Sequence, residues 1–177
     1  LDYPADGEGF AVELSVVEQP RLTLSSYEPV EVVMDQVPGY RFELGKGVLL
    51  REGGDVAILA TGIMVQDALK AAEALAAEGI SARVINLHTI KPIDREIILK
   101  AARECGAIVT SEEHNVLAGF GSAVAEVVSE GCPVPVVRHG VNDVFGRSGA
   151  AQQVLDAYGV NAAGIVEAVR KVLPMKK

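Results

Sequence analysis

A chain of 177 residues, about half of them apolar and none of them Trp, is long enough to bury a sizeable core and too rich in apolar side chains to be disordered. Its formal net charge of -8, with no cluster of basic side chains, argues against a nucleic acid as a partner. No stretch approaches the roughly 20 apolar residues of a membrane span, and Cys105 and Cys132 have neither metal-ligand nor redox spacing, so we expect a cytoplasmic protein with no membrane or metal partner.

The N-terminal third is acidic and interrupted by prolines. Residues 1–45 hold nine acidic and two basic side chains, whereas the rest of the chain holds fifteen and fourteen. Extended segments and turns are predicted here, with a domain boundary between Tyr27 and Arg41. We interpret the acidity as solvated surface, because most charged stretches are simply exposed.

From residue 55 onward, short apolar runs rich in β-branched residues alternate with segments of helical periodicity. The predicted strands are VAILAT (56–61), RVINL (83–87), AIVTS (107–111) and VPVVR (134–138). Strands that alternate with helices in this way imply right-handed crossovers and parallel pairing. The sequence therefore predicts a three-layer α/β fold, with a mainly parallel, twisted sheet of about five strands and helices on both faces.

Each predicted helix has one apolar face. The first helix ends near Gly79, a residue type typical of helix C-termini, and the second begins after Asp94, a good N-cap. Two more helical stretches, near 150–158 and 161–173, complete the covering layer. The side chains predicted to face the sheet are Ala68, Leu69, Ala72, Leu75 and Ala76 in the first helix, Ile97, Ile98, Ala101 and Ala102 in the second, and Phe120, Val124, Val127 and Val128 in the third.

Residues 111–126 read SEEHNVLAGFGSAVAE and combine carboxylates, an imidazole and a glycine turn directly after a predicted strand. Ligands of open parallel sheets gather at this edge. Glu113 and His114 could form an acid/base pair, but no nucleophile in a recognisable motif accompanies them. Residues 119–121 could direct N–H groups at a phosphate, but the third glycine of the dinucleotide fingerprint is replaced by Val124. We therefore favour hydrogen-bonded, structural roles for this stretch.

Three longer strings carry a resemblance to a known family. They are GKGVLLREGGDVAILATGIMVQDALKAAEALAAEGISARVINLHTIKPID, SEEHNVLAGFGSAVAEVV and GVNDVFGRSG. Over about residues 29–177 the chain closely resembles the C-terminal domain of transketolases, and of the related 1-deoxyxylulose-phosphate synthases and 2-oxo acid dehydrogenase beta subunits. The similarity is greatest to bacterial and archaeal transketolases that are split into two chains. One departure is Ala118, because family members usually carry a glycine before Gly119.

The resemblance implies a domain organisation and a function. Residues 1–28 would be the remnant of a preceding pyrimidine-binding domain, residues 29–45 a linker, and residues 46–177 the transketolase C-terminal domain. The complete enzyme would transfer two-carbon ketol units between sugar phosphates, using thiamine diphosphate and magnesium. The G-D-G and N-N motifs that hold this cofactor are absent from the sequence, so we expect this chain to carry no catalytic, cofactor-binding or metal-binding residue and to be inactive alone.

The resemblance also implies an assembly role, because the family arranges these domains around a two-fold axis. We expect a homodimer, a complex with an N-terminal catalytic transketolase chain, or both. Val116, Leu117 and Phe120 form an apolar run that a lone chain would expose, so we expect these side chains to make the contact. Glu113 and His114 would be oriented beside them by hydrogen bonds and perform no chemistry.

Two alternatives remain open at this point. The chain could be a free-standing α/β regulatory module that binds a small anionic metabolite at a rim formed by Glu113, His114, Asp143 and Arg147. It could also be the equivalent domain of a 1-deoxyxylulose-phosphate synthase or of a 2-oxo acid dehydrogenase beta subunit.

Overall fold

The structure, a computed structural model, describes residues 41–176. The expected domain remnant at 1–28, and the linker at 29–45 apart from its last five residues, lie outside this range. In chain order the elements are β1 (Val48–Arg51), β2 (Val56–Ala60), α1 (Met64–Ala77), β3 (Ala82–Asn86), α2 (Arg95–Cys105), β4 (Ile108–Asn115), α3 (Phe120–Gly131), β5 (Val136–Val141), α4 (Ala151–Ala157), α5 (Ala162–Val172) and the short 3-10 helix η2 (Leu173–Met175).

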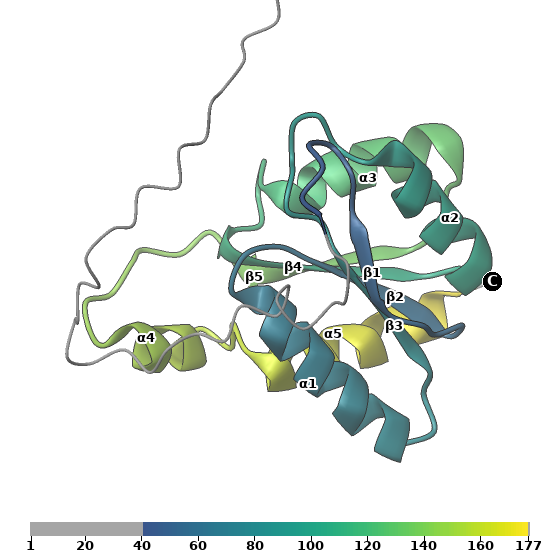
Figure 1. Cartoon of the computed structure of the whole chain (residues 1–177). Helices are drawn as coiled ribbons and strands as arrows, with labels where there is room; N and C mark the ends of the chain where they lie inside the picture. Colours follow the sequence, from purple (N-terminus) through teal and green to yellow (C-terminus); the bar gives the residue numbers. More distant parts are fainter. Residues whose placement is uncertain (1–40, 177) are drawn as a thin grey trace, which may run out of the picture. The chain divides into compact units, whose positions relative to one another are not determined.

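The five strands form one sheet in the order β1-β3-β2-β4-β5. The four strands predicted from the sequence are parallel, and β1 joins β3 in antiparallel fashion. Helices α1 and α5 cover one face of the sheet, and α2 and α3 cover the other (Figure 1). The predicted three-layer α/β fold is therefore confirmed.

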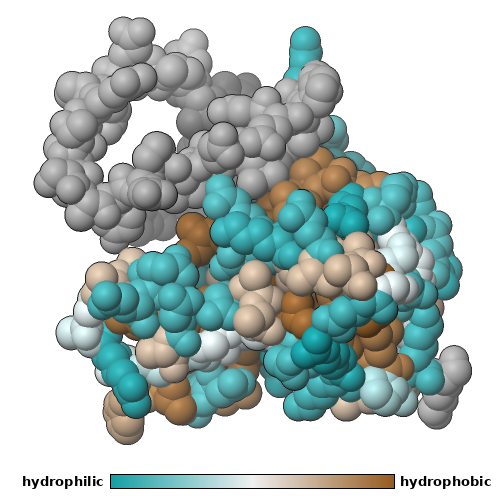
Figure 2. All heavy atoms as spheres, turned by 90° about the horizontal axis from the view of Figure 1, so that it is seen from below, coloured by the Kyte–Doolittle hydropathy of each residue, from teal (hydrophilic) through white to brown (hydrophobic). Residues whose placement is uncertain are grey.

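The core consists of two hydrophobic clusters, one on each face of the sheet. Every residue of β2 and β3 is buried, because these central strands have helices on both sides. This explains the continuous apolar sequence of β2 and the apolar residues of β3, which also contains the buried Arg83 and Asn86. Seen from the side of α1, α4 and α5, the described surface is largely hydrophilic, with hydrophobic residues showing between polar ones (Figure 2). None of the helices between residues 41 and 176 has the length and apolar character needed to cross a membrane.

The predicted helix limits agree with the structure, and so do the predicted inward faces except in α1. The prediction that the stretch near 150–158 completes the covering layer is wrong, because α4 has no buried residue. Asp94 caps α2 as predicted, accepting a hydrogen bond from the Ile97 N–H at 3.2 Å, and its other oxygen accepts one from the Gly47 N–H at 2.8 Å. In α1 the prediction is wrong for Ala76, which is exposed, whereas Ala71 is buried. The buried face of α1 is therefore rotated by one residue toward the N-terminus relative to the predicted face.

Strand β1 is the element that the sequence analysis did not identify. It has only four residues, one of them charged, and its pairing with β3 shifts register between Leu49 and Arg51. Because β1 is antiparallel, its first residue Val48 lies opposite Asn86 at the carboxyl end of β3. The chain therefore enters the domain at the carboxyl ends of the parallel strands, where open sheets of this kind usually present ligand-binding residues.

Candidate functional site

The N-terminus of α3 binds a carboxylate that belongs to the protein itself. Glu112, near the end of β4, is fully buried. Its Oε2 accepts a hydrogen bond from the Phe120 N–H at 2.6 Å, and its Oε1 accepts one from the Gly121 N–H at 2.9 Å. The N–H groups that could have bound a phosphate thus bind Glu112, and the positive end of the helix dipole favours the same charge. The phosphate interpretation of residues 119–121 is wrong.

The glycines of this turn are explained by the approach of the backbone to Glu112. A Cβ atom at Gly119 would overlap the Glu112 carboxylate, and one at Gly121 would overlap Oγ1 of Thr110. A Cβ atom at Gly140, on the neighbouring strand β5, would lie 2.9 Å from the Glu112 carbonyl oxygen. Close packing around Glu112 therefore explains why glycine occupies these three positions, and no bound ligand is needed to explain them.

Glu113 and His114 do not form a pair with each other. Successive side chains of a strand point to opposite faces, and His114 accordingly shares a face with Glu112, its Nδ1 lying 2.9 Å from Oε2 of that residue. Glu113 is exposed, and its carboxylate lies beside Gly62, where an added Cβ would be 2.8 Å from Oε2. The acid/base alternative for these two residues is excluded by this geometry. His114 is therefore close to Glu112 and not to Glu113, and its orientation by hydrogen bonds stays a prediction.

Two strained turns lie next to each other beyond the ends of β4 and β5. Ala118 has φ 56° and Asp143 has φ 47°, in the left-handed region that side chains other than glycine rarely adopt. The Asn115 side chain joins them, since its Nδ2 donates to Oδ1 of Asp143 at 2.9 Å and its Oδ1 accepts from the Leu117 N–H at 2.8 Å. Strain of this kind persists only where the surroundings hold the backbone in place, so Leu117 is presented in a fixed position.

The expected exposure of the 116–120 run is correct for only one of its three large side chains. Leu117 is 54% exposed, whereas Val116 is 7% and Phe120 1% exposed. Phe120 packs in the hydrophobic cluster between the sheet and helices α2 and α3. The Val116 N–H donates a hydrogen bond to the Val141 carbonyl of β5, which holds the backbone of Val116 beside that strand. The prediction that Val116 and Phe120 are available for an intermolecular contact is therefore wrong.

Leu117 belongs to a larger set of exposed apolar side chains at the carboxyl edge of the parallel strands. They follow β2, β3 and β4 or precede the antiparallel β1, and each is more than one-third exposed. We call them the apolar rim: Phe42, Leu44, Ile63, Ile90 and Leu117. The entering chain is fixed at this edge, because the ring centroid of Phe42 lies 4.8 Å from that of His88 and the Gly45 N–H donates to Oγ1 of Thr89.

Asp143 and Arg147 lie in the segment between β5 and α4. Asp143 accepts the hydrogen bond from Asn115, and the guanidinium of Arg147 lies 5.8 Å from the ring centroid of Tyr158. Of the four side chains expected to form an anion-binding rim, two are carboxylates and only one is a permanent cation. Carboxylates repel an anionic ligand, so the arrangement disfavours the anionic-metabolite alternative.

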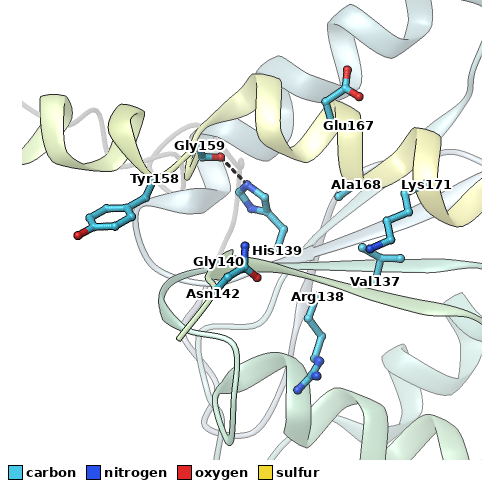
Figure 3. Close-up of a pocket in the computed structure, with 10 residues that line it drawn as sticks. All are labelled: Val137, Arg138, His139, Gly140, Asn142, Tyr158, Gly159, Glu167, Ala168 and Lys171. Atoms are coloured by element: carbon cyan, nitrogen blue, oxygen red, sulfur yellow. Dashed lines mark hydrogen bonds between the residues drawn. The ribbon is translucent and has the colours of Figure 1, made fainter. Parts of the chain in front are cut away.

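His139, which no sequence motif marks, lies at a hollow of about 230 Å³ between β5 and α5 (Figure 3). Burial lowers the pKa of His139, and the bond to the Gly159 carbonyl opposes this shift only in part. A carbonyl oxygen can only accept, so Nε2–H donates to Gly159 at 3.0 Å, and Nδ1 of the neutral ring accepts from the Ser111 hydroxyl at 3.0 Å. Both ring nitrogens are therefore used to connect structural elements.

The described residues do not fit the cofactor that the family resemblance implies for the complete enzyme. Between residues 41 and 176, no three His, Cys, Asp or Glu side chains are grouped so that they could hold a metal ion. The N-terminus of α3, the place where a diphosphate would find free N–H groups, holds Glu112. We therefore assign no chemical step to thiamine diphosphate or magnesium within this chain.

Comparison with known proteins identifies relatives of this arrangement. Residues 45–165 match the family of transketolase C-terminal domains. The chain is 53% identical over 135 residues to the 6-deoxy-6-sulfo-D-fructose transketolase subunit SqwH of Clostridium sp. strain MSTE9, covering 76% of this chain and 42% of that protein. It is 45% identical over 150 residues to 1-deoxy-D-xylulose-5-phosphate synthase 1 of Geobacter sulfurreducens, covering 84% of this chain and 23% of that protein.

A solved structure shows the same fold at high sequence identity. It is described as a split gene transketolase, an inactive beta4 tetramer, and it superposes with a TM-score of 0.77 at 55% identity over 80% of this chain and 46% of that one. This chain therefore spans less than half the length of the relatives that it matches.

Proposed function

Because this chain belongs to the family of transketolase C-terminal domains, we propose that it is the assembly domain of a transketolase whose catalytic domains lie outside this sequence. The complete enzyme would transfer two-carbon ketol units between sugar phosphates. Thiamine diphosphate and magnesium would supply the chemistry from the catalytic domains, and this chain would contribute none of the reacting groups. A relative that is named as a transketolase subunit supports the separation into two polypeptides.

The apolar rim is the observation that carries this proposal. Five large, exposed apolar side chains lie just before β1 or just after β2, β3 and β4, at the carboxyl ends of the parallel strands. Patches of this kind mark contacts between proteins or domains, and the turn that presents Leu117 is held rigidly by Asn115. We assign the rim to the contact with the catalytic domains. The two thiols, Cys105 and Cys132, are unpaired and suit a reducing, cytoplasmic location.

The test uses the purified chain and the companion polypeptide that carries the G-D-G and N-N motifs. We expect ketol transfer only when both are present, and no calorimetric binding of thiamine diphosphate with Mg²⁺ to this chain alone. Leu117→Asp should raise the dissociation constant of the complex at least about tenfold, since it buries an unpaired charge. Ala74→Asp, on the exposed face of α1, is the matched control and should have no effect. Micromolar cofactor binding, or equal effects of the two variants, would refute the proposal.

A second candidate follows from the 45% identity to a 1-deoxy-D-xylulose-5-phosphate synthase. The same assembly domain would then serve a different reaction on the catalytic domains. The two candidates differ in the product formed by the reconstituted complex. Accumulation of 1-deoxy-D-xylulose 5-phosphate, without exchange of ketol units between sugar phosphates, would favour the second.

A further inference from the structure

Strand β5 forms an open edge of the sheet, because it is last in the strand order and pairs only with β4. The Pro135 carbonyl accepts a hydrogen bond from the Ile108 N–H, so the odd-numbered residues of β5 direct their backbone groups at β4. The N–H and C=O groups of Val136 and Arg138 consequently point outward. Within residues 41–176, no group beyond the sheet is hydrogen-bonded to them.

This edge lacks the features that usually prevent pairing with another strand. Edges are commonly protected by bulges or by charged side chains that project over them. Strand β5 pairs regularly with β4 from Val136 to His139. Arg138 extends to the side of β5 opposite His139 (Figure 3), where it donates to the Val116 carbonyl at 2.8 Å and to the Ser122 hydroxyl at 2.9 Å. Its charge is therefore held away from the edge.

The hollow of about 230 Å³ lies beside this edge, on the side of α5. Its walls include Val137 and His139 of β5, and Ala168 and Lys171 of α5 (Figure 3). One molecule of liquid water takes about 30 Å³, so the hollow has room for a polar side chain. A space of the size of a side chain therefore adjoins unpaired backbone groups.

The charge at this hollow comes from Lys171. Its side chain extends toward β5, whereas Glu167 points away from the strand (Figure 3) and pairs with Arg170. No carboxylate between residues 41 and 176 forms an ion pair with Lys171. Both ring nitrogens of His139 are already hydrogen-bonded. The hollow thus presents an ammonium group that a carboxylate would neutralise.

We propose that the β5 edge binds an extended segment of another polypeptide as an added strand, with an acidic side chain of that segment in the hollow beside Lys171. Addition of a strand to an open edge is a recurring mode of peptide recognition, in which backbone hydrogen bonds supply affinity and side-chain pockets supply specificity. This goes beyond the proposed function, because it adds a second docking site that does not depend on the apolar rim.

Antiparallel pairing satisfies both the backbone and the hollow. Two residues of the added strand lie opposite Val136 and Arg138 and exchange about four backbone hydrogen bonds with them. The residue between these two lies opposite Val137, in a strand about 4.8 Å from β5. Val137 packs on the side of α5, and directly opposite side chains share a face. The side chain opposite Val137 is therefore the one that enters the hollow.

The composition of β5 indicates that the added strand has a different sequence from β5 itself. Strand β5 reads VVRHGV and has no acidic residue. A second β5 strand would therefore bring no carboxylate to Lys171 and would place another Arg138 near the first. An acidic segment rich in residues that favour strands fits the edge better.

The experiment is a titration of the full, ¹⁵N-labelled chain with the capped peptide Thr-Val-Thr-Glu-Thr-Val-Thr, followed by NMR. The backbone amide signals of Val136 and Arg138 should shift. A peptide with Gln in place of Glu should bind about two- to fivefold more weakly, as expected for one exposed ion pair. N-methylation of the two threonines beside Glu removes the donors that face β5 and should abolish binding.

A charge exchange tests the role of Lys171. Lys171→Glu should reverse the preference, so that a peptide with Lys in place of Glu binds the variant more tightly than the original peptide does. Lys171 is exposed, so circular dichroism should confirm unchanged folding.

Three results would overturn the proposal. The first is the absence of shifts at Val136 and Arg138 with millimolar peptide, including the case in which sedimentation shows a second copy on the edge. The second is equal binding of the Glu, Gln and Lys peptides. The third is that acetate produces the same shifts, which would make the hollow a small-anion site. Failure of the proposed function has a different signature, because Leu117→Asp would then not affect binding of the catalytic polypeptide.

Discussion

Replacing Glu112 with Gln should destabilise the domain strongly, although the two side chains have almost the same shape. Each oxygen of Glu112 faces a backbone N–H at the start of α3, from Phe120 and from Gly121, and one oxygen also lies next to Nδ1 of His114. Glutamine keeps one oxygen and replaces the other with an NH₂ group. Whichever way the amide is oriented, a donor then faces a donor in a fully buried position.

The cost follows from the contacts that are lost. A hydrogen bond to a charged group contributes about 1.5–3 kcal/mol, and a buried N–H without an acceptor costs about 1–3 kcal/mol. These terms overlap, so we expect the free energy of unfolding to fall by about 3 kcal/mol. For a chain of this length, each 1 kcal/mol lowers Tm by about 2–4 °C, which predicts a decrease of roughly 6–12 °C.

The measurement is urea unfolding at pH 7, followed by circular dichroism, with the midpoint compared at an unchanged slope. Glu113→Gln is the matched control, because it makes the same chemical change at the adjacent exposed position and should alter stability by less than about 0.5 kcal/mol. If Glu112→Gln also changed stability by less than about 0.5 kcal/mol, Glu112 would not be the carboxylate that holds the N-terminus of α3.

Three further predictions concern stability and its pH dependence. Asp94→Ala should cost about 2 kcal/mol in urea unfolding, more than the roughly 1 kcal/mol of a cap alone, because it also removes the acceptor of the Gly47 N–H; a loss below about 1 kcal/mol would contradict this. Ala118→Gly should raise stability by about 1 kcal/mol by removing left-handed strain, and a lower Tm would refute that explanation. In the folded protein, burial lowers the pKa of His139 from 6.5. As the pH falls below about 6.5, the unfolded chain therefore binds a proton before the folded protein does, and the free energy of unfolding decreases until the pH reaches the folded pKa. His139→Gln should therefore show a smaller decrease in Tm between pH 7 and pH 5 by calorimetry, and an unchanged pH dependence would count against the neutral ring.

The alternation of strands and helices could be predicted because the sequence pattern and the burial have the same cause. Central strands covered on both faces are mostly apolar, and the helices between them are apolar on one face. Strand β1 could not be predicted in this way, since its four residues are only half-buried at the edge of the sheet. Its position depends on pairing with β3, which no local pattern reports.

The contacts of this stretch were harder to predict, because adjacency in sequence does not imply adjacency in space. Glu113 and His114 are neighbours in the chain, but strand alternation directs them to opposite faces, and the true partner of His114 is two positions earlier. The bond between Glu112 and the N–H of Phe120 spans eight residues and a turn, so it becomes visible only when the end of β4 is known. The one available signal was a carboxylate that directly follows the apolar run 107–111 and precedes a glycine turn by a few residues.

The carboxyl edge of a parallel sheet is usually where small ligands bind, because helix N-termini and strand ends leave backbone N–H groups free there. In this chain the carboxylate of Glu112 accepts hydrogen bonds from the Phe120 and Gly121 N–H groups at the start of α3, and glycines let the backbone approach Glu112 closely. The exposed side chains at the carboxyl ends of the strands include the apolar Leu117, held outward by Asn115, next to the polar Glu113 and His114. A mixture of exposed apolar and polar side chains of this kind is typical of a surface that contacts another protein domain. This surface is consistent with the assembly role proposed for the domain, and the fold alone does not assign a small-molecule site to it.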